Sequence, residues 1–134
     1  MSFHKSLKAA AGALLLALAA QSGLALADGC PAAEAEQGQN VFARDCAACH
    51  SAGPNQPGMM GPNLHGVLGR KAGSLAGFPY SEAMKTKGAD WSRDNLDAFI
   101  EQPQGTVPGT YMPFAGLADA AERKAVTCWL SQQR

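Results

Sequence analysis

Two cysteines and a histidine form the most informative pattern in this sequence, Cys46-Ala47-Ala48-Cys49-His50. The pattern C-x-x-C-H is the attachment sequence for a covalent haem. Two residues between the thiols let both sulfurs reach the vinyl groups on one haem edge, and the next residue brings its imidazole under the iron. We therefore expect one haem c, attached through Cys46 and Cys49, with His50 as an iron ligand.

Two other chemistries use closely spaced cysteines. A redox-active C-x-x-C pair normally accompanies a β-α-β pattern, and the sequence shows no strand alternation. A zinc site needs a second pair of ligands at suitable spacing, which Cys30, Cys128 and His65 do not supply. Haem attachment is the interpretation that the pattern favours.

The second axial position of the iron needs a ligand from elsewhere in the chain. After residue 27 the sequence has four methionines and one further histidine, His65. Methionines ordinarily pack in cores or loops. Met112 differs because it lies in an irregular segment between Pro108-Gly109 and Pro113, where a rigid loop can hold a thioether at a metal. The spacing favours Met112 and leaves His65 as the alternative.

Four segments carry helical patterns that would position these residues. Residues 33–46 are good helix formers, with Gly38 placed where another helix would have to approach closely. Ser81 predicts the N-cap of a short helix ending at Gly88, and Ser92 predicts the N-cap of a third helix. Asp119 with Glu122 resembles a capping box that opens a last helix.

Two long stretches rich in Gly and Pro, residues 51–80 and 103–117, are predicted to be irregular. A compact domain with this much loop needs something else to organise it. A buried haem would supply both an apolar core and a covalent link.

Residues 1–27 have the pattern of a secretory signal peptide: Lys5 and Lys8, an uncharged apolar run, and Ala25-Leu26-Ala27 before Asp28. This predicts a mature chain from Asp28 in the periplasm. An uncleaved anchor is the alternative, but the apolar run is shorter than the about 20 residues that a membrane span needs. Lipid attachment at Cys30 is a weaker alternative because Asp28-Gly29 is a poor context for it.

The remaining 107 residues suggest one domain, and they contain 9 basic and 11 acidic residues, a net charge of −2. A nucleic-acid-binding protein would be expected to be basic, so this class is disfavoured.

Beyond the attachment motif, the sequence resembles the class I c-type cytochromes of the soluble mitochondrial and bacterial type over about residues 34–131. The resemblance implies an all-α class I cytochrome c fold, with short helices and long loops around one haem. The matching segments are Gly38-x-x-x-Phe42, Gly61-Pro62-Asn63-Leu64-His65-Gly66, Gly69-Arg70-Lys71, Gly77-Phe78-x-Tyr80-Ser81, Lys87-Gly88-x-x-Trp91 and Pro108-Gly109-Thr110-x-Met112-x-Phe114-Ala115-Gly116.

The resemblance also implies roles for single residues. Met112 becomes the second axial ligand, His65 becomes structural, and the Pro62 carbonyl accepts a hydrogen bond from the His50 ring. The remaining haem-binding residues are implied to be Arg70, Tyr80 and Trp91 at the propionates, and Thr110 and Phe114 at the exposed haem edge. Three loop positions that are often lysines in the family are Gln104, Gly105 and Tyr111 here.

In this fold the first and last helices cross, which brings the start of the domain near its end. We therefore expect a disulfide between Cys30 and Cys128, the two cysteines that the haem does not use, because exported thiols pair.

The expected function is outer-sphere electron transfer by a monomer that is not an enzyme, since two protein ligands leave no open iron position. Its partners would be membrane respiratory complexes or periplasmic dehydrogenases. The alternatives are a haem subunit of a larger dehydrogenase or oxidase complex and, with an open iron, a haem peroxidase or gas sensor.

Overall fold

The computed structural model describes residues 29–134, so the expected signal peptide over residues 1–27 lies outside the described residues. The helices of this part are α1 (Ala32–Asp45), α2 (Glu82–Thr86), α3 (Arg93–Glu101), α4 (Pro103–Thr106) and α5 (Ala120–Ser131). Between residues 29 and 134 the extended pairing consists of one bridge, Lys71 with Asp90. No helix in the described chain is long and apolar enough to cross a membrane.

Three helices begin where the sequence predicts caps. The Ser81 hydroxyl accepts from the Met84 N–H at 3.2 Å and starts α2. Ser92 forms a reciprocal capping box with Asn95 at the start of α3. The Asp119 carboxylate accepts from the N–H groups of Ala121 and Glu122, which satisfies backbone donors that a helix start otherwise leaves unpaired.

Two local expectations are corrected. The Glu122 carboxylate does not reach back to Asp119 but forms an ion pair with Arg44 at 2.7 Å, so the capping box expected there is only half formed. The stretch 103–117 is not wholly irregular, because it opens with the single turn of α4. Pro103 stands at the first position of that turn, where its missing N–H costs nothing.

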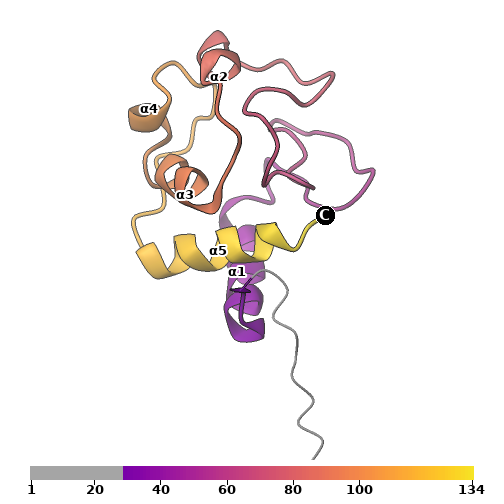
Figure 1. Ribbon diagram of the computed structural model, residues 1–134, viewed down its shortest axis with the longest axis vertical. Coiled ribbons are helices and arrows are strands. Elements are labelled where there is room, and N and C mark those ends of the chain that lie inside the picture. The colour runs from indigo at the N-terminus through magenta and orange to yellow at the C-terminus, as the bar shows by residue number, and fades with distance from the viewer. Residues whose placement is uncertain (1–28) are drawn as a thin grey trace, which may run out of the picture.

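The crossing of α1 and α5 organises the domain. Figure 1 shows α5 lying across α1, with α2, α3 and α4 toward one side and the long loop of residues 51–80 toward the other. A Cβ atom added at Gly38 would overlap the Ala125 carbonyl and lie 2.7 Å from the Trp129 Cβ. The two backbones therefore touch at Gly38. Beside the contact, Phe42 packs on Trp129 with 4.7 Å between ring centroids.

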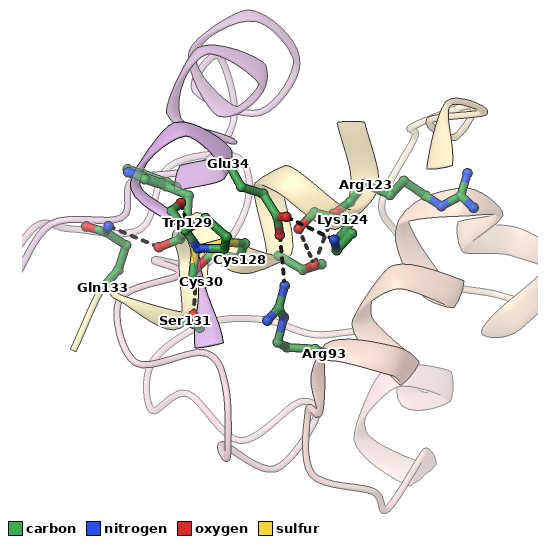
Figure 2. The surroundings of a disulfide bond; sticks show 11 residues. Cys30, Glu34, Arg93, Arg123, Lys124, Cys128, Trp129, Ser131 and Gln133 are labelled. Atoms are coloured by element: carbon green, nitrogen blue, oxygen red, sulfur yellow. Dashed lines mark hydrogen bonds and ion pairs between the residues drawn. A yellow bond between two sulfur atoms is a disulfide. The ribbon is translucent and has the colours of Figure 1, made fainter. Parts of the chain in front are cut away.

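The Cys30–Cys128 disulfide links the beginning of α1 to α5, with 5.5 Å between the two Cα atoms. Both cysteines are buried. Figure 2 shows Glu34 beside this disulfide, where its carboxylate pairs with Arg93 of α3 at 3.3 Å and Lys124 of α5 at 3.0 Å. The start of α1 is thus fixed covalently to α5 and by ion pairs to both α3 and α5.

Arg123 is a buried charge that the sequence patterns do not reveal. Its guanidinium pairs with Asp97 and Glu101 of α3 and donates to the carbonyls of Leu117 and Ala118. A buried cation must be paired to persist, and these partners supply the pairing. Arg123 therefore ties α5 to α3 and to the segment that follows Met112.

We predict that Gly38→Ala destabilises the protein, because the new Cβ has no space against the α5 backbone. Overpacking costs about 1–3 kcal/mol, and we expect the free energy of unfolding to fall by about 2 kcal/mol in urea titrations. Gly58→Ala is the control, since a Cβ there meets nothing closer than 3.4 Å. Equal stability of the two variants would contradict the close crossing.

We predict that the double variant Cys30→Ala/Cys128→Ala loses about 2–4 kcal/mol of stability. The disulfide closes a sequence separation of 98 residues, which the unfolded chain would otherwise be free to explore. Wild-type protein treated with a reductant should unfold at the same urea concentration as the variant, which separates the loss of the bond from the loss of packing. Free thiols at Cys30 and Cys128 in mass spectra of the unreduced protein would refute the pairing.

Candidate functional site

The attachment motif continues directly from the end of α1. The Cys46 N–H still donates to the Phe42 carbonyl at 2.9 Å, and the Cys46 carbonyl accepts from Cys49 at 3.0 Å and from His50 at 2.9 Å. This turn gathers the three motif side chains within a few residues of the α1–α5 crossing. Cys46 and Cys49 take no part in the disulfide, which joins Cys30 to Cys128.

The His50 ring is oriented by the loop that follows the motif. Its Nδ1 lies 2.8 Å from the Pro62 carbonyl oxygen, which can only accept, so Nδ1 carries the proton and Nε2 is left with its lone pair. Burial lowers the pKa of His50, and the hydrogen bond to Pro62 partly opposes this. Gly61 has no Cβ, and one placed there would overlap the ring. The loop thus presents a neutral imidazole with a free Nε2, the form that binds metals.

The thiols do not resemble a zinc site. Among residues 29–134, the one cluster with metal-ligand spacing is Cys30, Glu34 and Cys128, whose sulfurs are joined and whose carboxylate is paired with cations. Neither His50 nor the two motif cysteines belong to it.

Apolar side chains at the edge of the core fit a large apolar group. Several touch the core yet are only partly buried, although residues of this kind are normally well covered in a folded domain. They are Leu64, Leu68, Tyr80, Met112 and Phe114. A separate hollow of about 430 Å³ lies beside His50, between Phe42, Ala47 and residues of the 51–59 loop, and its lining includes neither Cys46, Cys49 nor Met112. The turn that gathers the C-x-x-C-H side chains, the oriented imidazole and the incompletely covered apolar side chains together fit a covalently attached haem.

Arg70 and Trp91 are brought together by the backbone. The Trp91 N–H donates to the Arg70 carbonyl at 3.0 Å, and the Trp91 carbonyl accepts from Gly69 at 2.8 Å. The Arg70 guanidinium donates to the carbonyls of Asn63 and His65. Trp91 is buried against Phe99, with 5.2 Å between ring centroids. Two residues expected at the propionates thus lie side by side, although they are 21 positions apart in the sequence.

The remaining expected site residues lie in two places. The Tyr80 ring meets Phe78 edge-on at 4.8 Å, and burial raises the pKa of its hydroxyl. Thr110 is buried, and its hydroxyl accepts from the Met112 N–H at 3.3 Å. Phe114 follows on the same segment and is half-buried. His65 is half-buried, its backbone N–H donates to Asn63 and its carbonyl accepts from Arg70, in keeping with a structural role.

Asn63 is a site residue to which sequence reasoning gave no role. Its buried side-chain amide donates to the carbonyls of Gly53 and Gln56 at 3.0 and 2.7 Å. Its backbone carbonyl accepts from the Arg70 guanidinium. It therefore holds the loop that carries the Pro62 carbonyl. Its place directly after Pro62 in a Gly- and Pro-rich stretch is the signal that could have identified it.

Comparisons with known proteins place the chain in a family. The family model described as Cytochrome c matches residues 35–134. A cytochrome c2 from Rhodoblastus acidophilus is 45% identical over 101 residues, covering 75% of this chain and 94% of its own. A cytochrome c from Stellaria longipes is 41% identical over 97 residues, covering 72% of this chain and 90% of its own. A cytochrome c2 from Rhodomicrobium vannielii is 42% identical over 97 residues, covering 72% of this chain and 77% of its own.

The helical fold, the attachment motif and these matches define a class of protein in which a small α-helical domain holds one haem covalently. The chain belongs to the cytochrome c family. Its cofactor is one covalent haem c with its iron, and its activity is electron transfer rather than enzymatic turnover.

Proposed function

We propose that this chain is a periplasmic one-electron carrier in which His50 and Met112 fill both axial positions of the haem iron. The observation that carries the proposal is the hydrogen bond between His50 Nδ1 and the Pro62 carbonyl, which leaves Nε2 available. When bound, the haem supplies an iron that exchanges single electrons. Cys46 and Cys49 would hold it as thioethers, and Arg70, Tyr80 and Trp91 would bind its propionates.

Met112 is supported as the second ligand by its setting. It is partly buried, its N–H is bound by the Thr110 hydroxyl, and the next residue is Pro113. A thioether held by such a segment fits a low-reorganisation site, and Met/His ligation raises the reduction potential of a haem. With both positions filled by protein atoms, Thr110 and Phe114 would border the haem edge through which electrons pass.

Export is supported by two separate features. The sequence of residues 1–27 has the order of a signal peptide. The buried Cys30–Cys128 disulfide suits an oxidising compartment, because cytosolic thiols are kept reduced. Bacterial cytochromes c2 are among the similar proteins.

The docking surface for redox partners is proposed to be uncharged. Residues 51–69 and 102–118, the two segments that carry Pro62 and Met112, contain no Asp, Glu, Lys or Arg. The large exposed apolar side chains of the described chain all lie in these segments: Met59, Met60 and Tyr111, with exposed fractions of 54%, 77% and 74%. We propose that they contact the membrane complexes or periplasmic dehydrogenases that exchange electrons with the protein.

Several lysines outside these segments interact with other side chains of the protein. Lys85 pairs with Glu82 at 2.8 Å and Lys124 pairs with Glu34 at 3.0 Å. Lys87 lies over the Trp91 ring, 5.4 Å from its centroid. Of the four lysines in the described chain, two are therefore paired with carboxylates, and Lys71 and Lys87 keep their charge without such a pair.

We predict that Met112→Ala abolishes the red absorption band of Met–Fe(III) ligation in the ferric holoprotein and lowers its reduction potential. Met60→Ala is the control, because Met60 is exposed and should leave band and potential unchanged. An unchanged band in Met112→Ala would show that another group ligates the iron. A wild-type spectrum without the band would favour the open-iron alternatives, a peroxidase or a gas sensor.

We predict that electron transfer to membranes from the same organism depends weakly on salt. Electrostatic steering raises association rates about 10- to 1000-fold, and here we expect less than about a threefold change between roughly 0.01 and 0.1 M ionic strength. Tyr111→Lys should introduce a salt dependence, whereas Lys85→Gln, which removes an already paired charge, should not alter it. A steep fall in the wild-type rate with salt would refute the uncharged docking surface.

A further inference from the structure

The segment that carries Met112 begins with a tight turn. The Thr110 N–H donates to the Val107 carbonyl at 3.0 Å, across Pro108 and Gly109. Gly109 has a φ of 89°, which suits the third position of a type II turn after proline. Val107 and Thr110 are buried, so the turn is fixed at both of its ends. Met112 itself follows two residues beyond Thr110.

One side chain outside this turn binds it at three points. The Gln104 Nε2 donates to the Thr110 carbonyl at 2.8 Å and to the Met112 carbonyl at 3.4 Å. The Gln104 Oε1 accepts from the Gly109 N–H at 3.4 Å. Each end of the amide faces backbone groups of the complementary kind. A lysine at this position could donate to the carbonyls but could not accept from the Gly109 N–H.

The other end of the segment is held differently. The Leu117 N–H donates to the Ile100 carbonyl at 3.0 Å, and the buried Arg123 binds the Leu117 and Ala118 carbonyls. A Cβ added at Gly116 would overlap the Glu101 carbonyl, so the backbone is pressed against α3 there. Buried partners therefore fix the far end of the segment.

The Met112 peptide group has weaker ties. Its N–H is bound by Thr110, which belongs to the same segment and moves with it. Among the described residues, the hydrogen bond that reaches this peptide from outside residues 107–117 comes from Gln104, an exposed residue of α4. Opening of the segment at Met112 must therefore break the Gln104 contacts while those of Arg123 remain.

We propose that Gln104 is a positioning residue that controls how readily Met112 leaves the iron. The proposal rests on Met112 being the axial ligand, as proposed above. Gln104 holds the Val107–Thr110 turn and the Met112 peptide in place. External ligands therefore reach the iron only when the Gln104 amide releases this turn. Substitution should speed ligand exchange at the iron without changing the resting coordination.

The test is imidazole binding to the ferric holoprotein, followed by the loss of the Met–Fe(III) band. At saturating imidazole the rate is limited by departure of Met112, so it reports opening of the segment. Gln104→Ala removes all three hydrogen bonds, and Gln104→Glu keeps the size and the acceptor but loses both donors. Because each lost hydrogen bond contributes modestly, we expect a limiting rate about tenfold faster in both variants.

Gln39→Ala and Gln39→Glu are the matched controls, since Gln39 is an exposed glutamine of α1 and its variants carry the same changes in size and charge. Their limiting rates should equal the wild-type rate. The Gln104 variants should retain the red band at rest and unfold at nearly the wild-type urea concentration. Such a pattern separates local opening from a general loss of stability.

Two results would overturn the proposal, and they are distinguishable. If wild-type protein shows the Met–Fe(III) band and the Gln104 variants exchange at the rate of the Gln39 controls, Gln104 does not control the segment, although Met112 remains the ligand. If the wild-type protein lacks the band, the ligand assignment fails and this inference fails with it.

Discussion

The contact between the backbones of α1 and α5 at Gly38 is the constraint on which the rest of the structure depends. It sets the two helices at a distance that no side chain at position 38 would allow. Because the attachment motif begins one residue after α1 ends, the crossing also decides where the thiols and His50 lie. At the beginning of α5, Arg123 binds the segment after Met112. Both proposed ligands of the iron are thus positioned from one helix pair.

The ends of the helices were predictable because their signals are local. Ser81, Ser92 and Asp119 cap helices through hydrogen bonds to residues two or three positions away, so the sequence contains both partners. Glu122 shows where local reasoning fails. Its spacing from Asp119 suggests a capping box, but Arg44, 78 residues away, binds the carboxylate more effectively through two hydrogen bonds.

The site residues also separate into those with a local sequence signal and those that depend on distant contacts. The C-x-x-C-H spacing identifies the attachment residues without any knowledge of the fold, because the chemistry requires that spacing. Arg70 and Trp91 have no such signature: their proximity depends on backbone pairing between distant loops, and it could be expected only from the family resemblance. Arg123 and Asn63 escaped notice because a buried arginine or asparagine resembles a surface residue until its partners are known. The single turn of α4 was missed because Gln102 and Pro103 give little helical pattern.

The uncharged segments around the proposed haem edge bear on how selective such a carrier is. Specificity between proteins depends largely on penalties against wrong partners, such as unmatched charges that must be desolvated. Residues 51–69 and 102–118 present no charged group that could impose that penalty. Met59 and Met60 are unbranched and adaptable, and thioether surfaces of this kind accommodate many shapes. A protein that docks through such a face would discriminate poorly by charge between redox partners.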